Sequence, residues 1–463
     1  MVISLAILGG NMNQFNETQK IETTDRNKSM KKFTVLVAGQ FISSIGSGLT
    51  DFGLAIYVLQ LNGSVTATSI LSICAFLPSI VLAPVGGVLA DHYDRRLMMI
   101  MGELFSGLGL VICLASVMST NPSLFLICTG VAISSLFSAL MEPAFKATIT
   151  DLLCEEDYAR AGGMVQIAFN SKLLISPAVA GLLLRVTSVS TLIIIDIFTF
   201  FTTVFVIAFV RKGMAVKHKN AESLNFAREM KEGVKAIRGK SGIAAMIVIM
   251  SIAVFCLGFV QILSKPLILA FAGETELGIL ATVSAFGMMA GSIAISMMKN
   301  IKSHVRLLSS GLFCCGIFFA LMGVRENLFL IAAFGFMMFV FLPFVQIGAE
   351  VLIRKNLANE VQGRAFGLIS FITQMGYIFA YILSGVLADY VFEPFMLGSS
   401  PMALKAGILI GTGDGRGIAL LILIAGLLLA VVGIIVFRLK SIKTLEGDIN
   451  KNEITDKTCL EGL

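Results

Sequence analysis

The sequence contains no tryptophan, only three histidines and little charge. Charged residues make up 14% of its 463 residues, and hydrophobic residues make up 56%. A soluble globular protein has about 25% charged and about 45–50% apolar residues. The composition therefore excludes a soluble enzyme and a disordered chain. The eight cysteines are scattered and have no metal-ligand spacing with histidine, so we expect no disulfide scaffold, no metal site and no cofactor. An integral membrane protein that is not an enzyme fits these numbers.

Long apolar stretches repeat along the chain from Phe33 onward. Each is about long enough to cross a hydrocarbon layer of ~30 Å as a helix. The sequence predicts an all-α membrane protein with twelve transmembrane helices. The predicted spans cover residues 33–61, 66–90, 97–118, 123–143, 161–185, 189–210, 242–270, 275–298, 305–323, 328–352, 364–389 and 416–438.

The basic residues are distributed unevenly between the two ends of these spans. With twelve spans, both termini lie on one side, and that side carries 29 of the 35 Lys and Arg residues. Cytoplasmic loops are enriched in Lys and Arg, so the bias predicts that both termini are cytoplasmic. The protein has a net charge of +6, but its basic residues alternate with apolar spans, a pattern that indicates membrane topology and not a nucleic-acid-binding patch.

A shift of 204 residues aligns the two halves of the chain. Under this shift Gly181 falls on Gly385 and Gly87 on Gly291. A six-helix offset preserves orientation, so the pattern predicts two parallel-repeat six-helix bundles, as in secondary transporters. Chance matching between Gly-rich helices is the alternative.

The leading 29 residues are predicted to be dispensable. The predicted parts are an N-terminal segment (1–32), a first bundle (33–210), a linker loop with a short amphipathic helix (211–241), a second bundle (242–438) and a tail (439–463).

The loop after the second span carries a cluster of charges. Asp91 ends that span, and Asp94, Arg95 and Arg96 follow at the next helix start, where they can form a latch that breaks between conformations. Simple anchoring by the two arginines is the alternative. The pattern Gly87-x-Leu-Ala-Asp91-x-x-x-Arg95-Arg96 is similar to the loop 2–3 signature of the major facilitator superfamily. His92 stands where that family usually has Arg or Lys, and Asp94 where it often has Gly.

Several stretches resemble, more narrowly, the macrolide-efflux-like branch of that superfamily in Gram-positive bacteria. Among them are Phe76-Leu77-Pro78 in the second span and Ser176-Pro177-Ala178 in the fifth. The resemblance implies export of a small molecule from the cell, usually in exchange for protons. The fifth-span motif of drug–proton antiporters is matched only in part, because Pro177 and Gly181 are present and two of its glycines are Ser and Ala.

Ionisable residues inside spans are costly and are therefore candidates for function. Lys172 lies near the middle of the fifth span, flanked by Asn170 and, two turns earlier, Gln166. Asp51 is a candidate partner for Lys172, although helix counting places the two about 11 Å apart in depth, which argues against direct contact. Asp51 is the first candidate for the proton-coupling acid and Glu142 the second.

Other acidic residues receive a structural interpretation. Asp196 lies near the outer end of the sixth span, where packing or capping is favoured over transport. Glu103 is expected to brace the loop 2–3 latch.

The prediction that combines these features is a secondary active exporter in the bacterial cytoplasmic membrane. It would move macrolide-like amphipathic drugs by proton antiport, as a monomer whose partners are its substrate, protons and membrane lipid. Two alternatives stay open. One is an exporter of a specific metabolite such as a siderophore, and the other is a non-transporting membrane sensor or assembly factor with the same fold.

Overall fold

The computed structural model describes residues 2–210, 235, 241–298, 301, 303–357, 359–398 and 400–447. Among these residues, twelve segments are long and apolar enough to cross a membrane, which confirms the predicted all-α membrane fold. The first set of helices comprises α1 (Val2–Asn62), α2 (Val65–His92), α3 (Arg95–Val117), α4 (Leu124–Leu152), η1 (Glu155–Asp157), α5 (Tyr158–Leu174), α6 (Ser176–Leu184) and α7 (Val189–Val210).

The second set of helices follows after residue 240. It comprises α9 (Ser241–Leu269), α10 (Glu274–Ser296), α11 (His304–Met322), α12 (Leu328–Arg354), α13 (Asn359–Leu387), the π-helix η3 (Ala388–Phe392), α14 (Glu393–Leu397), α15 (Pro401–Ile410) and α16 (Arg416–Arg438). The predicted linker helix lies in residues 211–241, nearly all of which are outside the described residues.

Short polar side chains begin many of these helices. Ser64, Asp94 and Ser303 each accept a hydrogen bond from a backbone N–H in the first turn of α2, α3 and α11, respectively. Asn327 does the same for α12. Such caps satisfy N–H groups that have no partner within the helix, so these four helices begin where an apolar run follows a capping residue.

Three elements differ from the predicted spans. The first span is the later part of the longer helix α1. The fifth is divided at Ile175 into α5 and α6, with Pro177 in the first turn of α6. Since proline has no N–H and disfavours a helical conformation in the residue before it, the break follows from the sequence. The eleventh span continues beyond α13 through the π-helix and α14.

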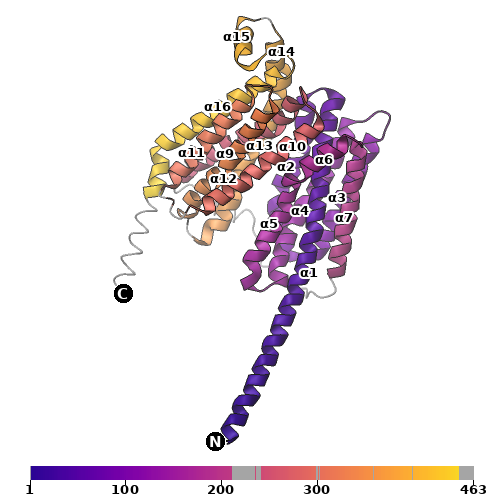
Figure 1. Cartoon of the computed structure of the whole chain (residues 1–463), viewed down its shortest axis with the longest axis vertical. Helices are drawn as coiled ribbons and strands as arrows, with labels where there is room; N and C mark the ends of the chain where they lie inside the picture. The colour runs from indigo at the N-terminus through magenta and orange to yellow at the C-terminus, as the bar shows by residue number, and fades with distance from the viewer. Residues whose placement is uncertain are drawn as a thin grey trace.

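The helices of each set pack mainly with one another. In the first set α3 packs with α4 and α1 with α7, and in the second set α11 packs with α12 and α9 with α16. The two sets touch each other chiefly where α6 meets α10 and α2 meets α13. Figure 1 shows that the sets are inclined, approaching each other towards α14 and diverging towards the end where the chain begins.

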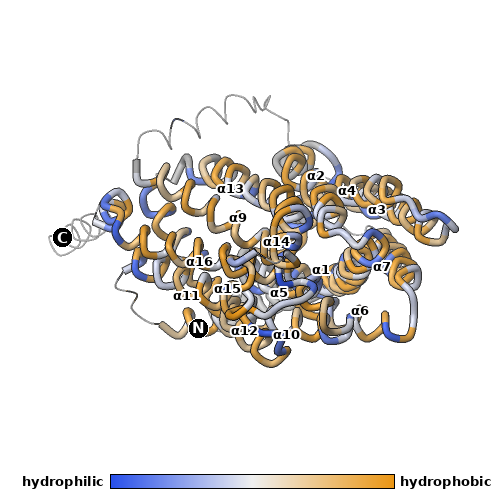
Figure 2. The backbone as a smooth tube through the Cα atoms, turned by 90° about the horizontal axis from the view of Figure 1, so that it is seen from above, coloured by the Kyte–Doolittle hydropathy of each residue, from blue (hydrophilic) through white to orange (hydrophobic). Residues whose placement is uncertain are grey.

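Hydrophobic side chains also cover the outer surface. Phe198, Phe205 and Phe209 on α7 and Phe329 on α12 are exposed on the protein surface. Seen from above, hydrophobic residues dominate the tubes of both sets (Figure 2). This apolar exterior is what a helix bundle surrounded by lipid requires.

Candidate functional site

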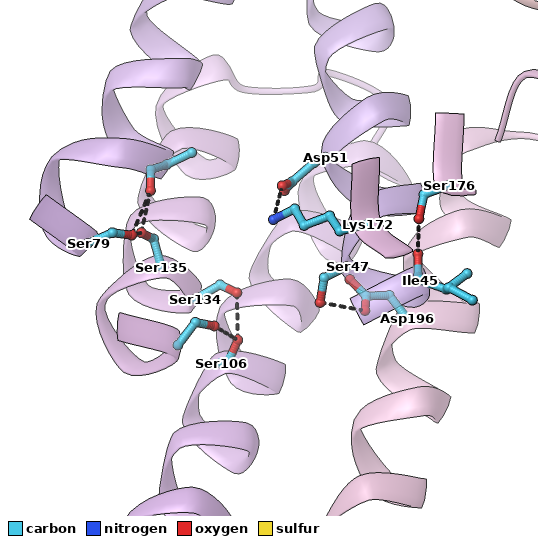
Figure 3. Close-up of polar contacts among 12 residues, drawn as sticks. Ile45, Ser47, Asp51, Ser79, Ser106, Ser134, Ser135, Lys172, Ser176 and Asp196 are labelled. Carbon is cyan, nitrogen blue, oxygen red and sulfur yellow. Dashed lines mark hydrogen bonds and ion pairs between the residues drawn. The ribbon is translucent and has the colours of Figure 1, made fainter. Parts of the chain in front are cut away.

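An ion pair links the first set internally. The Lys172 ammonium on α5 lies 2.5 Å from Asp51 Oδ2 on α1, and both side chains are half-exposed, at 43% and 50%. Asp51 is eleven residues from the end of α1 at Asn62, which places it ~16 Å along the helix from that end. The pair therefore sits near the middle of the apolar layer, and Figure 3 shows the Lys172 ammonium directed at Asp51.

The direct contact between Asp51 and Lys172 corrects the depth argument from the sequence. A Cβ on Gly48 would lie 2.8 Å from the Lys172 carbonyl oxygen, so the backbones of α1 and α5 are level at these two residues. Asp51 is three residues further along α1, or ~4.5 Å, and the long lysine side chain covers this distance. The estimate of about 11 Å was wrong because it measured both helices from span ends that do not lie at the same level.

Two buried carboxyl groups flank α1 below this pair. Ser43 donates a hydrogen bond of 3.3 Å to Glu103 Oε1 on α3, and Ser47 donates one of 3.4 Å to Asp196 Oδ1 on α7. Glu103 is 2% exposed and Asp196 is 1% exposed. Residues 43, 47 and 51 follow one another at four-residue spacing on α1: Ser43 and Ser47 each donate to an acid on a neighbouring helix, and Asp51 is itself an acid. Figure 3 shows Ser47 with Asp196 and Asp51 with Lys172.

The environment of Asp196 agrees with packing, and not with capping, of the two roles expected from the sequence. It lies in the third turn from the start of α7, beyond the first turn in which a capping group would lie. A Cβ on Gly46 would lie 2.8 Å from Asp196 Oδ1 and 3.2 Å from its Cα, so α1 and α7 approach closely at this point. Asp196 is a packed interior acid, and the side chain that reaches it is Ser47.

The other polar candidates lie closer to the terminal end of the bundle. Glu142 on α4 pairs with Lys146, one turn later, at 2.6 Å, and both side chains are about half-exposed. Gln166 is exposed on α5, and Asn170 is partly buried two residues before Lys172. Gln166 and Asn170 thus share a helix with Lys172, whereas the Glu142 carboxylate is engaged with a cation of its own.

The loop 2–3 residues lie at the junction of α2, α3 and α4. Asp94 accepts a hydrogen bond from the Arg96 backbone N–H and caps α3. Arg95 Nη1 donates to the Ala147 carbonyl of α4 at 2.9 Å, and Arg96 is buried. Gly87 and Asp91 fall in the last turns of α2, where only the backbone is described. These contacts cap α3 and tie its start to α4, and the latch function stays a prediction.

The fifth-span motif lies where the two sets meet. A Cβ on Gly181 would lie 2.5 Å from the Glu274 carbonyl oxygen of α10, and one on Gly278 would overlap the Pro177 carbonyl. Two hydrogen bonds cross beside these close approaches: the Ala178 N–H donates to Thr282 Oγ1 at 3.1 Å, and Thr275 Oγ1 donates to the Gly181 carbonyl at 2.9 Å. The break in the fifth span thus supplies contacts to the second set.

Sequence reasoning missed a second crossing between the sets. Asp389, in the π-helix that follows α13, accepts hydrogen bonds from Ser64 Oγ (2.7 Å) and from the backbone N–H groups of Val65 (3.0 Å) and Thr66 (2.8 Å). A carboxylate of the second set therefore caps helix α2 of the first. An acidic residue at the end of a predicted span was the one available signal, and it did not name the partner.

An aromatic cluster also bridges the sets and was not predicted. The ring of Phe76 on α2 lies 5.9 Å from that of Tyr377 and 5.6 Å from that of Tyr381, both on α13. Tyr381 Oη donates a hydrogen bond of 2.5 Å to Gln261 on α9. Such rings present flat apolar faces together with a polar group, a combination common in small-molecule sites.

Comparisons with known proteins agree with this architecture. A model of the Major Facilitator Superfamily matches residues 36–273. Macrolide efflux protein A of Streptococcus pyogenes is 26% identical over 365 residues, covering 78% of this chain and 90% of that protein. The uncharacterized MFS-type transporter YfiS of Bacillus subtilis is 27% identical over 375 residues, covering 79% of this chain and 88% of that protein.

A solved structure shares the fold. The bacterial homolog of the human lysosomal transporter Spinster, in an inward-facing and unoccupied conformation, matches with a TM-score of 0.67 at 12% identity, over 91% of this chain and 98% of that chain. With twelve apolar helices and these relatives, the protein is a multi-pass membrane protein of the bacterial plasma membrane. Because the family model covers more than half of its length, the chain belongs to the major facilitator superfamily.

Proposed function

We propose that the protein is a secondary active exporter of small amphipathic compounds, macrolide-like drugs among them, and that it exchanges them for protons by alternating access. The observation that carries this proposal is the ion pair between Asp51 and Lys172, in the middle of the apolar layer and half-exposed. Charged groups at that depth are expensive and are retained where they bind a substrate or an ion. Relatives named macrolide efflux proteins support the substrate class.

The packing of the two sets supports a rocking mechanism. The helix pairs α3/α4, α2/α4, α1/α7, α3/α7 and α1/α5 of the first set have counterparts six spans later in α11/α12, α10/α12, α9/α16, α11/α16 and α9/α13. This correspondence supports two parallel repeats, a first bundle over 33–210 and a second over 242–438, joined by the linker 211–241. Substrate sites of such transporters lie between the repeats, near the bilayer midplane.

The direction of access follows from the charge bias together with the shape. If the Lys- and Arg-rich terminal side is cytoplasmic, the contacts of Asp389, Thr275 and Gln60 close the outer side. Gln60 donates to Glu274 at 2.8 Å at this same end. The sets diverge towards the terminal side (Figure 1). The structure then corresponds to a state open to the cytoplasm, the side from which an exporter loads its substrate.

The experiment that tests this function is uptake of a labelled macrolide into inverted membrane vesicles, with and without a proton uncoupler. We expect uncoupler-sensitive uptake by the native protein and at least ~100-fold less by Asp51→Asn, because a neutral amide cannot hold a cation or exchange a proton. Asp414→Asn, in the exposed turn before α16, is the matched control and is expected to transport normally.

Each other outcome has a defined meaning. Uptake that survives in Asp51→Asn would make Asp51 structural and leave export standing. No uptake by the native protein would reject macrolides as substrates. A thermal-shift screen would then identify a specific metabolite as a ligand that stabilises the protein. A non-transporting sensor or assembly factor would show no flux of any ligand that it binds.

A further inference from the structure

Asp196 is the least exposed carboxyl group among the described residues, at 1%, and the mechanism above gives it no role. Its Oδ1 accepts the Ser47 hydroxyl at 3.4 Å, a long and weak hydrogen bond. Asp51 lies one turn beyond Ser47 on α1, ~6 Å further along the helix axis, and forms the ion pair with Lys172. Asp196 interacts electrostatically with both Asp51 and Lys172, and Asp51 interacts also with Lys265 on α9 of the second set.

The charges around α1 do not balance if every acid is ionised. Away from the helix ends, the described spans of the first set hold the carboxyl groups Asp51, Glu103, Glu142 and Asp196 and the cations Lys146 and Lys172, and Glu142 pairs with Lys146. Lys172 contacts Asp51, and the two buried acids are held by hydroxyl groups: Ser43 at Glu103, and Thr50 and Ser47 at Asp196. A buried carboxylate without a cation costs several kcal/mol, so in this state the two buried acids are stable only when they carry protons.

The two buried acids, Asp196 and Glu103, differ in how near they lie to Lys172. Glu103 is held by Ser43, two turns before Asp51, whereas Asp196 is held by Ser47, one turn before it. The lysine ammonium sits at the end of a flexible stem that starts level with Gly48, next to the turn that holds Asp196. Lys172 acts electrostatically on Asp196, and a rotation of its long side chain is the movement that would bring the ammonium from Asp51 to that acid.

We propose that Asp196 carries the exchanged proton and that Lys172 transfers the effect of substrate binding to it. This inference rests on the proposed function. A lipophilic organic cation takes the place of the lysine ammonium at Asp51. The released ammonium moves to Asp196, whose carboxyl O–H bond breaks, and the proton leaves to water with the Ser47 hydroxyl beside it as donor and acceptor.

The exchange conserves charge. One organic cation enters the site as one proton leaves, and each carboxylate keeps one cation at every stage: Asp51 the substrate and Asp196 the lysine. Nothing is oxidised or reduced. The substrate class that this arrangement selects is an amphipathic compound with a positive nitrogen or phosphorus centre, because a neutral compound has nothing to displace the lysine from Asp51.

The test measures proton release by the purified, full-length protein in weakly buffered detergent solution containing a pH-indicator dye. The probe is tetraphenylphosphonium, a lipophilic cation without a titratable proton, so every proton that appears comes from the protein. Binding is measured in parallel by equilibrium dialysis. We expect one proton per bound cation for the native protein. Asp196→Asn is expected to bind the cation and release none.

Two further variants identify the source of the proton. Glu103→Gln is the matched control, a second buried acid neutralised on a neighbouring helix, and it is expected to release the proton as the native protein does. Lys172→Gln combined with Asp196→Asn is expected to regain release, because without the lysine Asp51 itself carries the proton that the cation displaces. Thermal unfolding checks folding, and Asn at 196 mimics the protonated acid.

The outcomes separate this inference from the function beneath it. Full proton release from Asp196→Asn, or loss of release in Glu103→Gln alone, would overturn the inference while binding and transport stand. Cation binding by the native protein without proton release would do the same. Failure of the native protein to bind the cation would overturn both cation recognition at Asp51 and the inference that depends on it.

Discussion

The two helix sets share a packing pattern but differ in what they hold in their interiors. In the described first set, Asp51, Glu103, Asp196 and Lys172 lie away from the helix ends, among serines of α1. In the described second set, the interior is a large apolar cluster, with Tyr381 and Gln261 as a central polar contact.

The cations of the second set lie near helix ends. Lys265 is four residues before the end of α9, and Arg416 begins α16. Arg416 is 2% exposed, and its guanidinium contacts Glu326 at 2.6 Å and the Ile410 carbonyl at 2.8 Å. This comparison teaches that similar folds can divide the work: charge is handled in the first set, and the second supplies an apolar wall and the closing contacts.

The largest effect is expected from reversing the charge at Asp51. Asp51→Lys places two ammonium groups together and is expected to abolish macrolide uptake and, because both side chains are half-exposed, to destabilise the protein by only about 1 kcal/mol. Adding Lys172→Asp restores an ion pair with its ends exchanged. We expect thermal stability to recover in the double variant while uptake stays absent, because the carboxylate now projects from α5. Recovery of both would mean that the pair serves packing alone.

Removal of a buried cation from the second set is expected to lower the stability of the protein and to leave the coupling of transport to protons unchanged. Arg416→Met leaves the Ile410 carbonyl without its donor and Glu326 without its cation, and should cost about 3 kcal/mol in the free energy of unfolding. Thermal unfolding measures this loss. The protein that remains folded should keep its uncoupler-sensitive uptake. A loss of coupling without a loss of stability would contradict the division between the sets.

The sequence predicted the spans well because apolar length is a local property. It predicted the contacts between helices less well. Asp51 and Lys172 were named as candidate partners, but their direct contact was judged doubtful because the level at which α1 and α5 meet depends on packing near Gly48. The cap that Asp389 makes on α2 joins residues 325 positions apart in the sequence. Such pairings depend on how the two sets dock, which no local pattern encodes.

A smaller effect is expected from weakening the crossing at α2. Asp389→Asn removes the charge that accepts the backbone N–H groups of Val65 and Thr66. A helix cap contributes about 1 kcal/mol, so the equilibrium should shift about fivefold towards separation of the sets at this end. Cysteine cross-linking between residues 60 and 274 in the variant and the native background measures this shift. Unchanged cross-linking would show that Asp389 does not hold this end closed.

The smallest effect is expected in the aromatic cluster. Tyr381→Phe keeps the ring beside Phe76 and removes the hydrogen bond to Gln261. A neutral hydrogen bond contributes about 1 kcal/mol, so the concentration for half-maximal uptake should rise about fivefold while maximal uptake stays the same. Concentration-dependent uptake checks both values. A fall in maximal uptake alone would place the cluster in the conformational change and not in binding.

The most direct test of the division between the sets compares one variant from each in inverted vesicles. Asp51→Asn removes a charge from the interior of the first set. Gln261→Leu removes the polar contact with Tyr381 from the mainly apolar interior of the second. The measured quantity is the uncoupler-sensitive fraction of macrolide uptake. The account predicts that this fraction disappears in Asp51→Asn and is unchanged in Gln261→Leu, whose total uptake is merely weaker. Loss of the fraction in Gln261→Leu with retention in Asp51→Asn would contradict it.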